Sequence, residues 1–317
     1  MNEQVAAGID IGGTKIAIAF ENQAGERVAA RRLPTEVPLG PERILENVCR
    51  AIEEMRAESR TEIAAIGIGC PGPIDIARGL VLSPANLPDW TDFPIVEIVE
   101  ERFGVSVVLD NDANAAALGE YFYGAGRGFK DVFYVTISTG IGGAIICGGH
   151  IHHGVQAGAG EVGHTIVDPR GVQCRCGTHG CLETIASGTG IARRMRERLA
   201  AENGAEDTSA VTAETVVEMV RSGDRTAQAV WDETIEFLAI GLGNAITIIA
   251  PEAVVVGGGV AEAGELLLTP LRAEIEKNVT MLPIEKVEIL KAYLGSDSGV
   301  CGALMLARQA DRKQNVQ

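Results

Sequence analysis

Two stretches of this chain share one plan, in which an apolar strand, a glycine-rich turn and a second apolar strand follow one another. The first stretch runs from Gly8 to Phe20, with Gly12-Gly13-Thr14-Lys15 at its turn. The second places Thr139-Gly140-Ile141-Gly142-Gly143 between two such strands. Two strands joined by a glycine turn predict a hairpin whose tip presents free backbone amides. The repetition indicates a duplicated core, and we expect two facing hairpins to clamp a polyphosphate from both sides.

An acidic residue ends the first strand of the first hairpin. Asp10 stands at a place where a carboxylate can hold a hydrated magnesium ion. An ordinary hairpin with a solvated Asp10 and a solvated Lys15 explains the same residues, so this turn alone leaves both interpretations open.

Composition bounds the class of protein. A chain of 317 residues with 46% apolar content can bury a large core, and its length favours two lobes. The net charge of −16 argues against a nucleic-acid partner. The sequence has neither an unbroken apolar run of membrane-spanning length nor a secretory segment, so we expect a cytoplasmic globular protein. Four scattered cysteines are expected to be reduced core residues, namely Cys49, Cys70, Cys147 and Cys301.

Potential metal ligands gather between Gly160 and Glu183. Three thiolates and one imidazole fill a tetrahedral zinc shell and leave no position for a substrate, so we predict a structural zinc. Buried cysteines are the alternative interpretation. Disulfide bonds are disfavoured, because three cysteines cannot all pair among themselves and the sequence has no secretory segment. The metal would turn Glu161, Glu183 and the outer ring nitrogen of the histidine toward a ligand. The predicted zinc ligands are His164, Cys174, Cys176 and Cys181.

Two groups of basic residues are expected to face water. His150, His152 and His153 follow the second hairpin, where a metal tract and a solvated surface turn are both possible. No cysteine or carboxylate adjoins them in the sequence, so we expect the solvated turn. A solvated basic face is also expected on the helix after Ser187, from its four arginines Arg193, Arg194, Arg196 and Arg198.

A buried strand ends in Asp110-Asn111-Asp112 and leads into an alanine-rich helix. A carboxylate at a strand end and helix start is rigidly held, and the helix N-terminus favours its ionised form. Such a group suits a general base. Helix capping explains the same residues, since Asp and Asn are common caps. Both interpretations stay open at this point, with Asp110, Asn111 and Asp112 all as candidates.

Three further features bear on ligand binding. Gly67, Gly69 and Gly72 fit the dinucleotide pattern G-x-G-x-x-G, but neighbouring prolines prevent the helix that this fingerprint must open. Asn86 is an isolated loop asparagine, which is ordinarily a turn residue. The triplet Gly257-Gly258-Gly259 ends an apolar strand, where a flat ring can approach the backbone closely.

These motifs together resemble the ROK family of sugar kinases and repressors. The matching residues are E-x-G-H from Glu161, C-x-C-G-x-x-G-C-x-E ending at Glu183, and N-D-A-N-A-A-A from Asn111. The resemblance implies an α/β, two-lobed fold of the actin-like and hexokinase superfamily, with a duplicated ribonuclease H-like core and a structural zinc knot. We expect lobes at residues 1–112 and 113–297, with the zinc-binding segment at 161–183. We also expect the C-terminal helix, 298–317, to pack back on the first lobe.

The resemblance implies ATP-dependent phosphorylation of glucose at its 6-hydroxyl, with Asp112 as general base, in carbohydrate metabolism. The C-L-E-T-I-A-S-G continuation from Cys181 is similar to the glucose kinases of the family. Implied cofactors are ATP, Mg²⁺ and structural Zn²⁺, and the implied assembly is a homodimer or homotetramer. Implied sugar contacts are Asn86, Asn111, Asp112, Glu161, His164 and Glu183. Implied nucleotide and magnesium contacts are Asp10, Gly12, Gly13, Thr14, Lys15, Thr139, Gly140, Gly142, Gly143, Gly257, Gly258 and Gly259.

Other functions compete with this one. Mannose, fructose, N-acetylglucosamine and N-acetylmannosamine stay open as substrates, and so does polyphosphate in place of ATP. A sugar-sensing repressor would carry a helix-turn-helix segment ahead of the first turn, whereas seven residues precede Gly8 and the charge is acidic. A sensor that binds ATP without phosphorylating sugar is the third class.

Overall fold

The computed structural model describes residues 3–84, 86–203 and 208–314. The chain forms two compact units. The first comprises Met1–Gly128, Ile151–Ala159 and Tyr293–Gln317, and the second comprises Phe129–His150 and Gly160–Ala292. The first unit thus continues past the expected boundary at residue 112, because the helix that starts there packs against the C-terminal helix. Residues 1–2 and 315–317 of the expected lobes lie outside the described residues.

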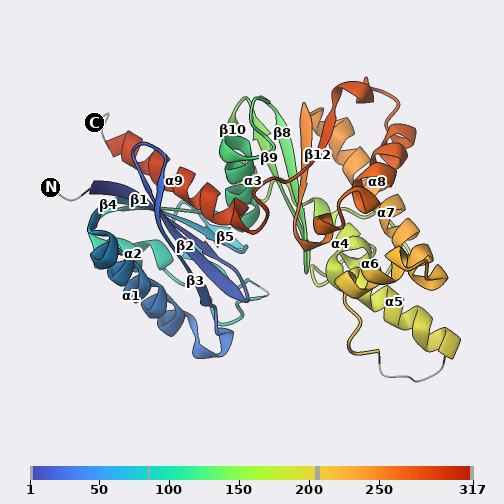
Figure 1. Ribbon diagram of the computed structural model, residues 1–317, viewed down its shortest axis with the longest axis horizontal. Coiled ribbons are helices and arrows are strands. Elements are labelled where there is room, and N and C mark those ends of the chain that lie inside the picture. The colour runs from blue at the N-terminus through green and yellow to red at the C-terminus, as the bar shows by residue number, and fades with distance from the viewer. Residues whose placement is uncertain (1–2, 85, 204–207, 315–317) are drawn as a thin grey trace. The chain divides into compact units, whose positions relative to one another are not determined.

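The first unit is built on a five-stranded sheet with the order β3-β2-β1-β4-β7 (Figure 1). β1 pairs antiparallel with β2 and parallel with β4. Its strands are β1 (Glu3–Ile11), β2 (Lys15–Asn22), β3 (Arg27–Pro34), β4 (Thr61–Cys70) and β7 (Ser106–Asn111), beside a two-stranded sheet of β5 (Ile74–Asp75) and β6 (Leu80–Val81). Its helices are η1 (Val37–Leu39), α1 (Pro41–Ser59), α2 (Ile95–Phe103), α3 (Asp112–Tyr123), η2 (Val155–Ala157), η6 (Gly295–Asp297) and α9 (Ser298–Gln314).

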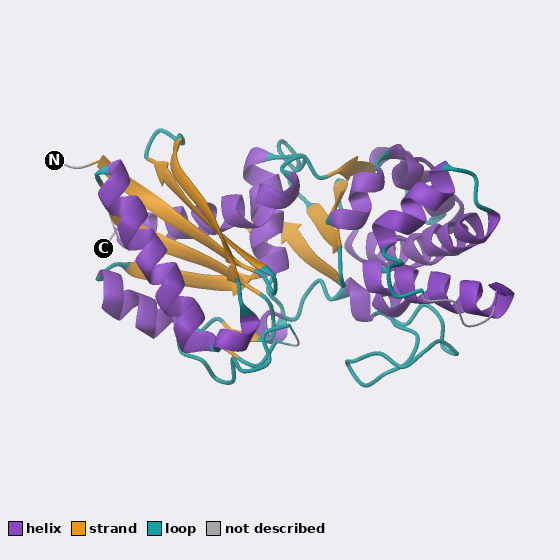
Figure 2. Cartoon of the chain, turned by 60° about the horizontal axis from the view of Figure 1, so that its bottom comes forward, coloured by secondary structure: helices purple, strands orange, loops and turns teal. Residues whose placement is uncertain are grey.

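Side chains of β1 alternate between two buried faces, as the period of a strand requires. Val5, Ala7, Ile9 and Ile11 share one hydrophobic cluster with the apolar stripe of α1. Helices lie on both sides of these strands (Figure 2). On the opposite face α9 comes so near that a Cβ on Gly8 would lie 2.7 Å from the backbone nitrogen of Leu304.

Glycines also allow α3 and α9 to cross closely. A Cβ on Gly302 would lie 1.5 Å from the carbonyl oxygen of Ala115, and one on Gly119 would lie 2.1 Å from that of Ser298. No side chain fits at such distances. These contacts hold α3, and with it Asp112, in the first unit.

The second unit holds a sheet with the order β10-β9-β8-β11-β12. β8 pairs antiparallel with β9 and parallel with β11, which repeats the pairing of β1 and confirms the predicted duplication. The strands are β8 (Val132–Ile137), β9 (Ile141–Cys147), β10 (His150–Ile151), β11 (Ala253–Gly257) and β12 (Glu288–Lys291). The helices are η3 (Val162–His164), α4 (Leu182–Ala186), α5 (Gly188–Asn203), α6 (Ala213–Arg221), α7 (Arg225–Ile249), η4 (Gly259–Ala263), α8 (Glu265–Asn278) and η5 (Ile284–Lys286).

Helix α7 is central to the core of the second unit. Its Trp231, Ile235, Leu238, Leu242 and Ile246 recur at helical spacing and are buried in one cluster with one face of β8 and β11. The burial of this stripe places α4 to α8 around the sheet and fixes the loops at the ends of β8 and β11.

Among the described helices, none combines the length and the apolar character that crossing a bilayer requires.

All seven cysteines are free thiols. The expected core location is right for Cys49, Cys70 and Cys301, and it is wrong for Cys147, which is exposed at the end of β9.

Candidate functional site

The first unit brings Asp10 and Asp112 together at the ends of two strands. A Cβ on Gly69 would lie 3.7 Å from Oδ1 of Asp10 and 3.9 Å from Cα of Asp112. Burial raises the pKa of Asp10 to about 7, the nearby Asp112 charge adds to this shift, and Lys15 opposes it. A buried carboxylate next to a second one is stabilised by a cation. Oxygen ligands of this kind suit magnesium, and Asp10 is the residue that would hold it.

The N-terminus of α9 lies directly behind this acid. A Cβ on Gly299 would lie 2.5 Å from Cγ of Asp10. The glycine at this position therefore leaves room for the Asp10 carboxylate.

The start of α3 separates the two interpretations of the Asp-Asn-Asp corner. Asn111 is the N-cap, and its side chain accepts a hydrogen bond from the Ala113 amide at 2.8 Å. Asp112 is the first residue of the helix, and its Oδ1 accepts from the same amide at 2.8 Å. Capping therefore accounts for Asn111, whereas Asp112 also faces the charge of Asp10. The side-chain amide of Asn111 lies beside the turn Pro71-Gly72-Pro73, since a Cβ on Gly72 would be 3.1 Å from Nδ2 of Asn111.

The first phosphate turn is closed by contacts that the sequence did not reveal. The Gly12 amide donates to the Lys15 carbonyl at 2.9 Å, so this predicted phosphate donor is occupied within the turn. Thr35 supports the turn, because its hydroxyl donates to the Gly12 carbonyl at 2.6 Å and its amide donates to the Thr14 carbonyl at 3.1 Å. Asn86 lies against the turn, with its Cβ 3.0 Å from where a Cβ on Gly13 would stand.

The second glycine turn is shorter than the sequence pattern predicts. Ser138, Thr139 and Gly140 form it, whereas Gly142 and Gly143 lie in β9 and pair with Thr136 and Val135. The predicted extension of the turn through Gly143 is therefore wrong.

A packing requirement explains the second of these strand glycines. A Cβ on Gly143 would lie 2.5 Å from the carbonyl oxygen of Gly160. Gly143 is thus needed for the close approach of the segment that leads into Glu161.

The acids around the metal cluster adjoin this second turn. Oε2 of Glu183 accepts a hydrogen bond from the Ile141 amide at 2.9 Å and would lie 2.4 Å from a Cβ on Gly140. Desolvation raises the pKa of Glu161, His164 opposes this shift, and the charge of Glu183 adds to it. The structure therefore brings together three predicted sugar contacts, Glu161, His164 and Glu183, within the second unit.

A cavity of about 280 Å³ opens in the second unit beside the same turn. Thr139 and Gly259 line it together, although they are far apart in the sequence. The lining also includes Thr189, Arg196, Thr212 and Glu214, which the sequence reasoning missed. These residues come to the turn through the fold, because no pattern in the sequence connects them with Thr139.

The basic face predicted on α5 is only partly solvated. Arg194 and Arg198 both pair with Glu233, and burial lowers the pKa of Arg194. Arg196 donates to the Val211 carbonyl at 2.6 Å. Its Nε is a buried side-chain nitrogen that has no hydrogen-bond partner within the described part of the chain. The helix therefore presents Arg196 to the cavity rather than to water.

The late glycine triplet has two separate roles. Gly258 has a φ of 87°, and a Cβ there would lie 2.3 Å from the Ile137 carbonyl oxygen, so only glycine fits between β8 and β11. Gly257 ends β11, and Gly259 lines the cavity.

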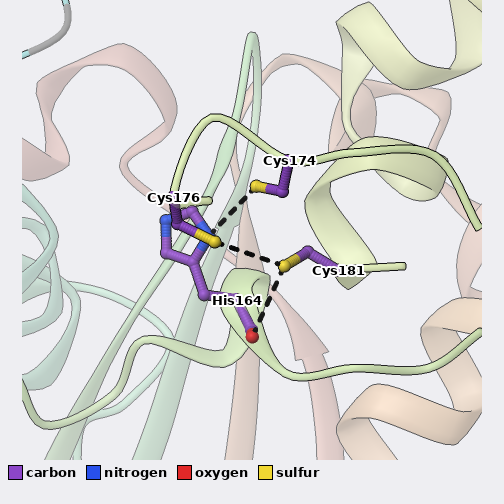
Figure 3. Close-up of side chains that lie close together, drawn as sticks. All are labelled: His164, Cys174, Cys176 and Cys181. Atoms are coloured by element: carbon purple, nitrogen blue, oxygen red, sulfur yellow. Dashed lines mark hydrogen bonds between the residues drawn. The ribbon is translucent and has the colours of Figure 1, made fainter. Parts of the chain in front are cut away.

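The predicted zinc ligands converge in the second unit (Figure 3). The ligand atoms of His164, Cys174, Cys176 and Cys181 all lie within 4.8 Å of one another. Nδ1 of His164 is 3.6 Å from the Cys174 sulfur, and the Cys176 and Cys181 sulfurs are 3.6 Å apart. Zn–S bonds of about 2.3 Å at tetrahedral angles put sulfurs about 3.8 Å apart, so the four residues fit zinc. The sulfurs are too far apart for a disulfide bond.

Backbone contacts bring the metal loop to this geometry. Isolated bridges join Gln173 to His179 and Ile166 to Cys181. Gly180 has a φ of 72°, and a Cβ there would lie 1.6 Å from the Asp168 carbonyl oxygen. Because Nδ1 of His164 faces the sulfurs, its Nε2 is the outer ring nitrogen that the sequence analysis assigned to a ligand.

The histidines beyond the second hairpin do not form a purely solvated turn. Nε2 of His153 lies 2.8 Å from Oδ2 of Asp110. Oδ1 of Asp110 accepts from the Asn111 amide and from Nδ2 of Asn114. Both oxygens of Asp110 are therefore engaged, which disfavours Asp110 as the base and leaves Asp112 as the candidate.

Comparison with known proteins agrees with these features. The ROK family model matches residues 6–310. The chain is 36% identical to the glucokinase of Halalkalibacterium halodurans, over 98% of this chain and 97% of that protein. It is 34% identical to the N-acetylmannosamine kinase of Escherichia fergusonii, over 95% and 97%. A ROK family glucokinase from Streptomyces griseus, in complex with glucose and AMPPNP, superposes with a TM-score of 0.81 at 35% identity over 96% of this chain and 99% of that one. The chain therefore belongs to the ROK family and has its two-sheet α/β kinase fold.

Proposed function

We propose that this ROK protein is a hexokinase-type enzyme that transfers the γ-phosphoryl group of ATP to the 6-hydroxyl of glucose. Relatives named glucokinase match nearly the whole chain at 34–36% identity. The structural neighbour from Streptomyces griseus holds glucose and an ATP analogue. The observation that carries the proposal is that Asp112 lies beside Asp10 at the strand ends of the first unit, while Asn86 lies against the first glycine turn.

Asp112 is the proposed general base. Its position as the first residue of α3 keeps the carboxylate at a helix N-terminus, which favours the ionised form that accepts a proton. The sugar 6-hydroxyl gives its proton to Asp112 as its oxygen attacks the γ-phosphorus, and ADP leaves with the bridging oxygen. Asn111 and Asn86 hydrogen-bond the sugar from the first unit.

The second unit supplies further proposed sugar contacts. Glu161 and Glu183 accept hydrogen bonds from sugar hydroxyls, and Nε2 of His164 provides a group of fixed orientation. Zinc, held by His164 and the three cysteines, would fix the loop and take no part in the chemistry, because its shell is complete.

Each glycine turn is a proposed phosphate-binding site. The Gly13 and Thr14 amides and Lys15 bind phosphate in the first unit, and magnesium at Asp10 would neutralise phosphate charge. In the second unit the Thr139–Gly140 turn borders the cavity of about 280 Å³. The adenosine belongs in this cavity, because Gly259 gives a flat ring access and the side chains of Thr189, Thr212 and Glu214 can bind ribose hydroxyls.

A second candidate is phosphorylation of another hexose, since the N-acetylmannosamine kinase of Escherichia fergusonii matches almost as well. A coupled assay of ADP release across glucose, mannose, fructose, N-acetylglucosamine and N-acetylmannosamine discriminates between these activities. We expect the highest kcat/KM with glucose. A higher value with another hexose would move the assignment to that sugar, and glucose binding without ADP release with any hexose would indicate a sensor.

A further inference from the structure

The carboxylate of Asp110 is buried beside the proposed base. Asp110 is 3% exposed and lies at the end of β7, two residues before Asp112. Its Oδ1 accepts from the Asn111 amide at 2.7 Å and from Nδ2 of Asn114 at 2.8 Å. Its Oδ2 lies 2.8 Å from Nε2 of His153. An ionised carboxylate only accepts hydrogen bonds, so Nε2 of His153 carries the proton of this contact.

This contact meets an electrostatic need. A buried carboxylate is costly unless its oxygens are hydrogen-bonded and its charge is compensated. Within the described residues, His153 is the basic side chain that lies within ion-pair distance of Asp110. The hydrogen bond to Asp110 raises the pKa of His153, which favours the charged form of the ring.

The segment that carries His153 is itself anchored in the first unit. Ile151 packs against a cluster of buried apolar residues from α3 and α9. The Ala159 amide donates to the His153 carbonyl at 3.0 Å, and Gly154 turns the chain with a φ of 64°. The imidazole is thus presented to Asp110 by a closed loop.

We propose that His153 is a positioning residue for the base. It holds Asp110, which in turn holds the Asn111 amide and the Asn114 side chain, and these two residues flank Asp112 at the start of α3. The inference rests on the role of Asp112 given above. Without the imidazole, Oδ2 of Asp110 has to turn toward water, and the first turn of α3 loses its alignment.

Three variants test this role. We expect His153→Ala to lower kcat about 10–100-fold, the effect of misplacing a reacting group, while KM for glucose changes less than about threefold. His153→Gln retains an N–H donor and should keep kcat within about threefold of wild type. His152→Ala, an exposed neighbour, serves as the matched control. The proposal is wrong if His153→Ala stays within twofold of wild type, or if the Gln variant is as impaired as the Ala variant.

A spectroscopic measurement separates this inference from the proposed function. In ¹H–¹⁵N spectra of the wild-type imidazoles, the Nε2 proton of His153 should be protected from exchange, and its resonance should shift in Asp110→Asn while that of His152 does not. A rapidly exchanging His153 proton would overturn the inference even in an active kinase. A protected proton in a protein that phosphorylates no hexose would instead refute the role given to Asp112. Melting temperatures of the variants verify that folded proteins are compared.

Discussion

The hairpins β1–β2 and β8–β9 follow one plan but end differently. The first has four residues, Gly12 to Lys15, between its last paired residues, Ile11 and Ile16, and it has an acid, Asp10, on the strand itself. The second has three such residues, Ser138 to Gly140. In this hairpin the position that corresponds to Asp10 is taken by Thr136, which pairs with Gly142. Its acid comes from elsewhere, because Glu183 of α4 accepts from the Ile141 amide.

From this difference we predict different roles for the two hairpins. The acid of the first hairpin is part of the sheet and lies against α9, so it is held by the core of the first unit. The acid of the second hairpin follows the predicted metal ligand Cys181 by two residues, so we expect its position to depend on the loop that zinc would fix. We therefore expect the groups that take part in phosphoryl transfer to lie in the half of the molecule that holds the first hairpin. We expect the half that holds the second hairpin to bind ligands only when zinc fixes its loop.

Asp112→Asn tests whether the chemistry belongs to the half of the molecule that holds the first hairpin. The amide keeps the shape of the carboxylate but accepts no proton, so kcat should fall about 10²–10⁴-fold. Glucose binding, measured by calorimetry, should be retained. Turnover close to that of wild type would remove Asp112 from the role of base.

Cys176→Ser tests the metal dependence of the half that holds the second hairpin. Loss of one thiolate should release zinc, measured by elemental analysis, and lower kcat/KM for glucose about 10–100-fold. Wild-type protein treated with a chelator should behave in the same way. A metal-free protein with full activity would show that the loop holds its shape without zinc.

Glu183→Gln separates two roles of one side chain. A neutral acceptor weakens the hydrogen bond from the Ile141 amide by about 1 kcal/mol, which is about a fivefold change. If Glu183 chiefly supports the turn, KM for ATP rises. If it chiefly binds sugar, KM for glucose rises instead. That result would contradict the role of Glu183 as the acid that supports the second turn.

The smallest effect concerns pH. The hydrogen bond with Asp110 raises the pKa of His153 above its ordinary value of 6.5. The stabilisation from this pair is therefore fully present below about pH 6.5 and is lost as pH rises through the raised value. Because the His153 side chain is 42% exposed, screening limits the contribution to about 1 kcal/mol or less.

Denaturant unfolding of wild type and His153→Gln from pH 5.5 to 8.5 measures this contribution. Asp110 is the charged group that lies within ion-pair distance of the ring. The difference in the free energy of unfolding should be larger at low pH. A constant difference would mean that the ring does not gain a proton in the folded protein.

Sequence reasoning succeeded where residue type and short spacing carry the information. The paired hairpins and the zinc ligands are local patterns, and the sheets and the sulfur distances agree with them. It failed at the second turn, because glycine favours a turn and a close-packed strand alike. Gly143 lies in a strand, where it pairs with Val135, and the need for glycine there comes from Gly160, which becomes its neighbour only after folding.

The duplicated α/β core, the candidate metal ligands and the resemblance to the ROK family can be predicted from the amino-acid sequence, because they depend on hydrophobic period and on side chains close together in the chain. Folding brings Arg196 to the cavity beside Thr139, and it brings His153 to Asp110, which stands 43 positions earlier in the chain. Such contacts could not be predicted from the sequence, because they depend on the path of the backbone between distant residues, and packing over the whole unit sets that path.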